Sequence, residues 1–226
     1  MLSDKKVIIG LGSGRCGTVT LYKILNRYNA DVSHEKMQMP WEFNLTELHH
    51  NIENMEHRYQ PVVGDVACWW LNYVDYMKEN VKDIKFVCLK RNKQDTLNSF
   101  MERFKYEDYW TEKGMFPEYI DGIQTLTGVF PVLPLKDKRA ALSFYYDLYY
   151  QIAEEHVGNN FRIFDMWTLL NVKHQQQCLF DWLELPTHTP IIGQKWNNKK
   201  DIYNYEDVLD ENHPINYGKR LQGVTA

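Results

Sequence analysis

Residues 7–21 read Val7-Ile8-Ile9-Gly10-Leu11-Gly12-Ser13-Gly14-Arg15-Cys16-Gly17-Thr18-Val19-Thr20-Leu21. A short β-branched run enters a segment with four glycines, and a helical pattern of apolar residues follows from Leu21 onward. Glycine allows backbone N–H groups to turn inward, and the N-terminus of a helix adds partial positive charge. A strand, a glycine-rich loop and a helix in this order are typical of a cradle for a phosphate-like anion.

The loop departs from the common nucleotide-binding pattern at one position. Gly12 and Gly17, followed by Thr18, nearly match the Walker A spacing Gly-x4-Gly-Lys-[Ser/Thr]. No lysine stands between Gly17 and Thr18, and the cation of the loop is Arg15 instead. We therefore expect an anion-binding loop that is not a standard ATP or GTP loop.

The composition is that of an ordinary globular protein. The 226 residues suffice for one α/β domain and are marginal for two, with 44% hydrophobic and 25% charged residues. A net charge of −4 gives no support for a nucleic-acid or anionic-membrane surface. No apolar run approaches the roughly 18 residues of a membrane span, and residues 1–6 do not resemble a signal peptide.

The four cysteines are far apart and form no CxxC pair, so we expect no zinc or redox motif. Cys68 and Cys88 lie in apolar runs, which predicts buried, reduced core residues. We expect a cytoplasmic location.

Strand-like and helical runs alternate along the chain. The expected strands are 6–10, 30–33, 61–66, 84–89 and 161–164, and the expected helices are 18–28, 41–59, 71–79, 93–104, 138–156 and 175–183. This alternation predicts an α/β fold of three layers, αβα, with a central parallel sheet. We expect one domain over residues 1–226, with an irregular insertion at 105–137 that is typical of a lid or substrate loop.

A second anion-binding pair follows the fourth strand. Arg91 stands where an apolar strand ends, and Ser99 lies about one helical turn past Asp95, so its hydroxyl is expected to face Arg91. A guanidinium group and a hydroxyl at a strand end suit a phosphate. Since ligands of parallel sheets bind at the carboxyl ends of the strands, two anion sites at this edge indicate a ligand phosphorylated at two places.

These motifs resemble those of sulfotransferases that use 3′-phosphoadenosine 5′-phosphosulfate (PAPS). Residues 12–21 resemble the 5′-phosphosulfate loop of that family, and Arg91-x7-Ser99 resembles its 3′-phosphate motif. Residues 161–166 and 178–186 resemble, more loosely, a late strand-and-helix signature of bacterial members. The resemblance implies a P-loop NTPase-like sulfotransferase fold. It also implies transfer of a sulfuryl group to a hydroxyl or amine, release of adenosine 3′,5′-bisphosphate (PAP), and no required metal.

The resemblance also assigns donor-binding residues. Arg15 matches the loop cation of the family. The residues implied to contact PAPS are Gly12, Ser13, Gly14, Arg15, Cys16, Gly17, Thr18, Val19, Thr20, Arg91 and Ser99. The family often closes over the 3′-phosphate and adenine with a late basic loop. In the segment 186–226 this role would fall to Lys199, with Trp196 stacking on adenine.

The acceptor must lose a proton, so a general base is needed near the loop. Several branches of the family place a Glu just after the second strand, where this chain has Ser33-His34-Glu35-Lys36. Glu35 is the first candidate and His34 the second. Asp65 is a third candidate, a support for Arg15, or simply a helix cap. The His that cytosolic members carry after the third strand is absent here.

Two other functions stay open on the sequence. A P-loop kinase acting on a nucleotide or small molecule would use the Walker-like spacing, with residues 62–65 as a Walker B strand. The second alternative is a protein of this fold that binds a nucleotide without catalysing a reaction. The acceptor is expected to be a small molecule or carbohydrate, next to aromatic residues of the insertion: Phe104, Tyr106, Tyr109, Trp110, Phe116, Pro117 and Tyr119. Most of the tyrosines at 145, 146, 149 and 150 are expected to be core residues.

Overall fold

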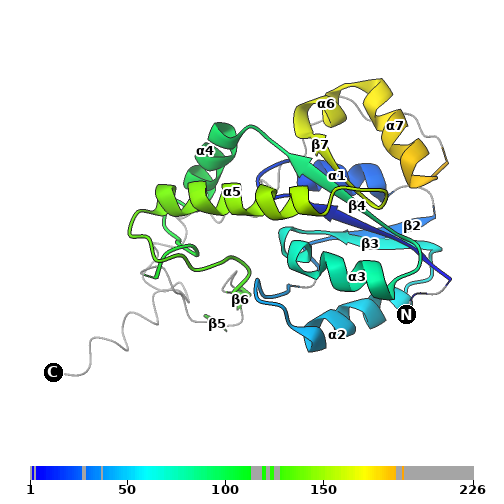
Figure 1. The fold of residues 1–226 in the computed structure, drawn as a ribbon, viewed down its shortest axis with the longest axis horizontal. Helices are drawn as coiled ribbons and strands as arrows, with labels where there is room; N and C mark the ends of the chain where they lie inside the picture. The colour runs from blue at the N-terminus through cyan, green and yellow to red at the C-terminus, as the bar shows by residue number, and fades with distance from the viewer. Residues whose placement is uncertain are drawn as a thin grey trace.

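The computed structural model describes residues 2, 4–26, 29–36, 38–112, 119–120, 123–124, 128–186 and 190. Its main sheet has the strand order β2-β3-β1-β4-β7, and every pairing in it is parallel (Figure 1). The strands are β1 (Lys6–Leu11), β2 (Ala30–His34), β3 (Val62–Val66), β4 (Ile84–Lys90) and β7 (Phe161–Asp165). The carboxyl ends of all five strands therefore meet at one edge, with β1 between β3 and β4.

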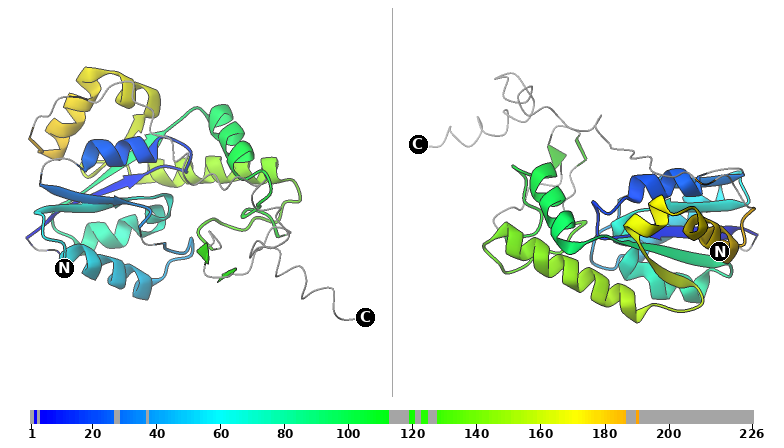
Figure 2. Two further views of the ribbon diagram at one scale, coloured as in Figure 1. Left: turned by 180° about the vertical axis from the view of Figure 1, so that it is seen from behind. Right: turned by 90° about the horizontal axis from the view of Figure 1, so that it is seen from above.

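Helices cover both faces of this sheet (Figures 1 and 2). One face carries α1 (Thr18–Leu25), α6 (Met166–Asn171) and α7 (Lys173–Leu183). The other carries α2 (Leu45–Glu56), the 3-10 helix η1 (Cys68–Tyr73), α3 (Val74–Asn80) and α5 (Lys138–Glu155), and α4 (Lys93–Arg103) packs against α5. The expected three-layer αβα fold is confirmed.

The pleat of β1 explains why its sequence is apolar throughout. Successive side chains of a strand point to opposite faces. Val7 and Ile9 join the core under α2, α3 and α5, whereas Ile8 joins the core under α1, α6 and α7. A strand that is buried on both faces needs a continuous apolar run, which is the pattern that made it recognisable in the sequence.

A capping side chain moves the start of α2 from its expected position. The helix expected over 41–59 begins at Leu45, because the Asn44 side chain accepts hydrogen bonds from the amides of Thr46 and Glu47. It ends at Glu56.

The structure also contains a helix that the sequence pattern did not predict. α6 has six residues, and the Asp165 carboxylate caps it by accepting from the Thr168 amide at 2.8 Å. A segment of this length is too short to show a helical period. The helix expected over 71–79 divides into η1 and α3.

The described part of the insertion 105–137 contributes largely to the core. Residues 119–120 and 123–124 form the short antiparallel pair β5 and β6. Phe104, Trp110 and Phe130 are buried and pack around Phe100 and Tyr145. These three rings are thus part of the packed interior. Phe116 and Pro117 lie outside the described residues.

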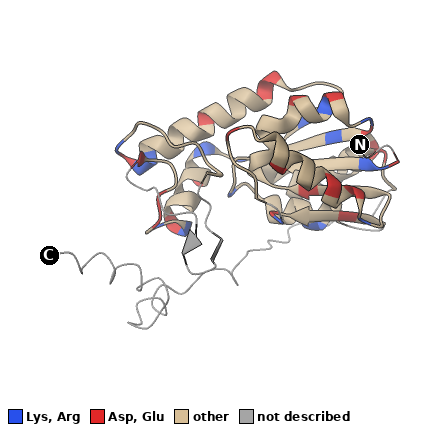
Figure 3. Cartoon of the chain, turned by 90° about the horizontal axis from the view of Figure 1, so that it is seen from below, with Lys and Arg blue, Asp and Glu red and all other residues tan. Residues whose placement is uncertain are grey.

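Cys68 and Cys88 are buried free thiols, as predicted. Within the described ranges, no helix is both long and apolar enough to cross a membrane. Acidic and basic residues are interspersed over the ribbon in the view of Figure 3.

Candidate functional site: an anion-binding edge

The glycine loop (residues 12–17) connects the end of β1 to the start of α1. Gly14 and Gly17 have φ values of 89° and 90°, in the left-handed region that favours glycine. A Cβ atom at Gly14 would lie 2.9 Å from Cζ of Phe100, and one at Gly17 would lie 2.8 Å from Cδ1 of Leu170. The loop therefore needs glycine here for both its backbone shape and its close packing.

Amides that precede the hydrogen-bond ladder of α1 gather where the loop enters the helix. The first hydrogen bond of the helical ladder runs from the Leu21 amide to the Gly17 carbonyl at 3.0 Å. The amides of Thr18, Val19 and Thr20 precede that ladder, and the N-cap Gly17 has no side chain to cover them. This arrangement of donors, together with the dipole of the helix, suits an anion.

The two anion motifs contact each other directly. Arg15 Nε donates a hydrogen bond to Ser99 Oγ at 3.1 Å, and Arg91 Nη1 donates to the Arg15 carbonyl at 2.9 Å. The sequence predicts that Ser99 faces Arg91, and the structure gives the Ser99 hydroxyl a hydrogen bond from Arg15. The contact arises because β1 and β4 are neighbours and α4 starts directly after β4. The two motifs therefore lie side by side at this edge.

Positive charge is concentrated at this edge. Burial and then the nearby guanidinium groups of Arg103 and Arg91 lower the pKa of Arg15. Like charges held together destabilise one another, and a bound anion relieves that repulsion. The guanidinium groups of Arg15, Arg91 and Arg103 thus lie near one another, and the carboxylates of Glu35 and Glu102 also act on Arg15.

The end of β2 brings His34 and Glu35 to the same edge. His34 Nε2 lies 3.2 Å from Thr18 Oγ1, at the start of α1, and 3.9 Å from Glu35 Oε1. The Glu35 side chain is 41% exposed and that of His34 only 12%. Burial, followed by the charge of Lys23, lowers the pKa of His34 to about 4. His34 is therefore neutral at neutral pH and Glu35 is the accessible group of the two.

We expect this shift to make the protein less stable in mild acid. The unfolded chain binds a proton on His34 below about pH 6.5, whereas the folded chain binds it only near pH 4. The contribution of His34 to the free energy of unfolding should therefore decline as pH falls from 6.5 to 4. Urea unfolding of the wild type and of His34→Gln across this range tests it. A wild-type-minus-variant difference that stays constant with pH would contradict it.

Asp65 lies deeper, at the end of β3. Its carboxylate accepts hydrogen bonds from Ser33 Oγ at 2.7 Å and from Trp70 Nε1 at 3.0 Å. Burial raises the pKa of this carboxyl. Both oxygens thus have partners, one from β2 and one from η1.

Two of the residues expected to bind the donor, Trp196 and Lys199, lie outside the described residues. Cys16 is fully buried, and burial raises the pKa of its thiol to about 11.

The sequence did not predict that Tyr149 and Tyr150 of α5 contact the loop backbone. The signal available for them was only a tyrosine-rich helix.

No family model and no curated protein sequence matches this chain. Among solved structures, the sulfotransferase from Alicyclobacillus acidocaldarius is similar with a TM-score of 0.51 and 12% identity, over 85% of this chain and 87% of that one. Mouse sulfotransferase SULT7A1, complexed with PAP, is similar with a TM-score of 0.48 and 14% identity, over 83% of this chain and 60% of the mouse chain. The chain therefore has the fold of the Alicyclobacillus sulfotransferase, and the resemblance seen in the sequence is confirmed at the level of the fold.

Proposed function

We propose that this chain is a sulfotransferase that moves a sulfuryl group from PAPS to a hydroxyl or amine of a small-molecule or carbohydrate acceptor. The observation that carries the proposal is the direct contact between the two anion motifs, Arg15 to Ser99 and Arg91 to the Arg15 carbonyl. A continuous site with two cationic ends suits a nucleotide phosphorylated at two positions. A nucleoside triphosphate carries all its phosphates at one.

Different residues would bind the two phosphorylated ends of the donor. The amides at the start of α1 and the Arg15 guanidinium would hold the 5′ group, and Arg91 with Ser99 would hold the 3′-phosphate. When bound, PAPS supplies an activated sulfuryl group. Donors that are fixed beforehand stabilise the negative charge that develops on the departing phosphate oxygens, because they need no reorganisation during the reaction.

Glu35 is the proposed base. Its carboxylate is accessible at the same edge as the loop, and His34 stands between it and Thr18. Neutral His34, whose Nε2 lies 3.9 Å from Glu35 Oε1, would help to position Glu35 beside the loop. Glu35 would then take the proton of the acceptor hydroxyl or amine as the new bond to sulfur forms.

The geometry gives less support to a kinase. A Walker B carboxylate has to reach a Mg²⁺ ion, yet Asp65 is buried and engaged by Ser33 and Trp70. The loop also has no lysine between Gly17 and Thr18.

A thermal-shift comparison tests the proposal. PAP without magnesium should raise the melting temperature more than ADP or ATP with magnesium. Ligand at 100 times its dissociation constant stabilises a protein by about 2.7 kcal/mol, which such a measurement detects readily. A larger shift with magnesium-ATP would support the kinase and contradict the sulfotransferase. A second assay measures the release of PAP from PAPS over a panel of phenols, sugars and alcohols. A protein whose melting temperature rises with PAP but which releases no PAP with any of these acceptors would support the non-catalytic alternative.

A further inference from the structure

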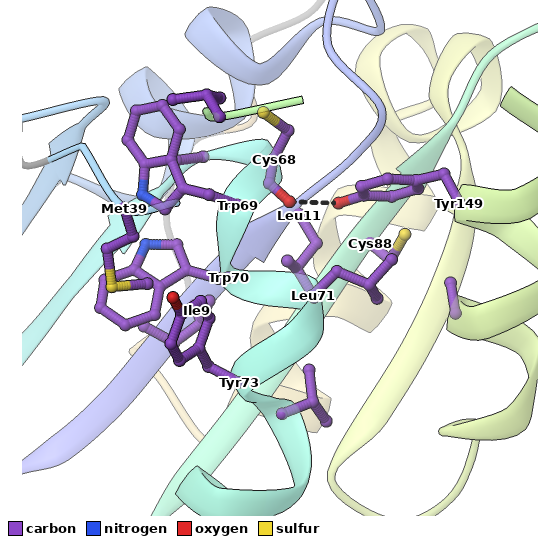
Figure 4. Close-up of a cluster of buried hydrophobic side chains, with 14 of the residues drawn as sticks. Ile9, Leu11, Met39, Cys68, Trp69, Trp70, Leu71, Tyr73, Cys88 and Tyr149 are labelled. Atoms are coloured by element: carbon purple, nitrogen blue, oxygen red, sulfur yellow. Dashed lines mark hydrogen bonds between the residues drawn. The ribbon is translucent and has the colours of Figure 1, made fainter. Parts of the chain in front are cut away.

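Two tyrosine hydroxyls of α5 hold the first residues of the glycine loop. Tyr149 Oη donates to the Cys68 carbonyl at 3.1 Å (Figure 4) and accepts from the Gly12 amide at 3.0 Å. Tyr150 Oη donates to the Leu89 carbonyl at 2.7 Å and lies 3.3 Å from Ser13 Oγ. The same oxygen accepts a longer bond, 3.5 Å, from the Ser13 amide. Each hydroxyl thus ties the loop to another segment of the sheet edge.

The neighbouring tyrosines extend this set. Tyr145 Oη donates to the Ser13 carbonyl at 3.0 Å, and Tyr146 Oη donates to the Arg91 carbonyl at 2.5 Å. Spacings of one, four and five residues place all four side chains on one side of the helix. A single helix therefore contacts the glycine loop, the end of β4 with Arg91, and the start of η1.

Burial keeps these hydroxyls in their donating form. All four tyrosines are buried. Burial raises the pKa of Tyr146 to about 12 and raises the pKa values of the other three well above the ordinary value for tyrosine. The hydroxyls stay protonated across the physiological range, so their bonds to the backbone persist.

We propose that the α5 tyrosines are positioning residues that set the spacing between the two phosphate subsites, an inference that rests on the proposed function. Tyr149 and Tyr150 fix the loop that holds the 5′ group, and Tyr146 fixes the backbone of Arg91 at the 3′ subsite. The Gly12 and Ser13 amides are already occupied by hydroxyls. The donors to the 5′ group are consequently the later amides, toward and within the first turn of α1.

Phenylalanine variants separate positioning from simple stability. Tyr146→Phe should weaken PAP about fivefold, the value of one ordinary hydrogen bond, and leave 5′-AMP unchanged. Tyr149→Phe should weaken both ligands by about this factor, because the loop itself is affected. Titration calorimetry measures the affinities, and urea unfolding measures the stability of each variant.

Tyr73→Phe is the matched control. The Tyr73 side chain is also buried. Its hydroxyl lies 3.1 Å from both the Pro40 and the Glu42 carbonyls, which share its one proton, and accepts from the Asn44 amide at 3.2 Å, away from the loop. This variant should lose stability like the others and bind both ligands like the wild type.

The outcomes show separately whether the tyrosines position the subsites and whether the proposed sulfotransferase function holds. If Tyr146→Phe and Tyr149→Phe lose stability but bind like the wild type, the inference is overturned and the function stands. A wild type that does not bind PAP overturns both. Amide hydrogen exchange tests the positioning role without any ligand. The amides of Gly12 and Ser13 should exchange faster in Tyr149→Phe or Tyr150→Phe than in Tyr73→Phe. Equal exchange rates would also overturn the inference.

Discussion

Replacing Glu35 with glutamine is expected to lower PAPS turnover by about 100-fold or more, within the range that a general base contributes. Glutamine keeps the shape of the side chain but cannot accept the proton of the acceptor. PAP affinity should stay near that of the wild type, because the proposed donor contacts come from the loop, Arg91 and Ser99. Turnover is measured as PAP released with an acceptor from the panel, and PAP affinity by titration.

The control for this variant is Glu53→Gln, an exposed glutamate on α2, which should turn over normally. His34→Gln should have a smaller effect than Glu35→Gln, since in the proposed mechanism neutral His34 orients Glu35 and does not take the proton. Normal turnover in Glu35→Gln would remove Glu35 from the base role and leave His34 and Asp65 to be tested.

Replacing Arg91 with alanine is expected to weaken PAP by about 30- to 100-fold, as the loss of charge-assisted hydrogen bonds implies. The effect on 5′-AMP should be only a few-fold, arising from the lost bond of Arg91 to the Arg15 carbonyl. The ratio of the two affinities, measured by titration calorimetry, isolates the contribution of the 3′-phosphate.

Two further variants serve as an intermediate case and a control for Arg91→Ala. Arg91→Lys keeps the charge but not the planar fork, so its loss of PAP affinity should be intermediate. Arg162→Ala changes an exposed arginine on β7, which stacks on Trp182, and should leave both affinities unaltered. Equal losses of PAP and 5′-AMP in Arg91→Ala would argue that Arg91 serves the loop alone.

The sheet was predictable because its strands are buried on both faces. A continuous apolar run such as residues 84–89, in a chain whose elements alternate, is typical of a central parallel strand, and β4 ends one residue beyond the expected position. Placing the loop, Glu35 and Arg91 at one edge then followed from parallel pairing.

The side-chain geometry of the site was not predictable in the same way. That Ser99 contacts Arg15 depends on the direction in which α4 leaves β4, which no periodicity encodes. The tyrosines of α5 were recognisable as core residues, but their hydroxyl partners depend on the register of the helix against the loop. Phe104 and Trp110 show a third limit, because an aromatic residue suits a ligand pocket and a packed core equally well.

The central claim is that the glycine loop and the Arg91–Ser99 pair form one site for a nucleotide phosphorylated at two positions. A crystal structure of the protein with PAP tests it most directly. We predict the 5′-phosphate at the amides of the first turn of α1 and the Arg15 guanidinium, with the 3′-phosphate within hydrogen-bond distance of Arg91 and Ser99. PAP bound away from this edge, or with its 3′-phosphate remote from Arg91, would contradict the account.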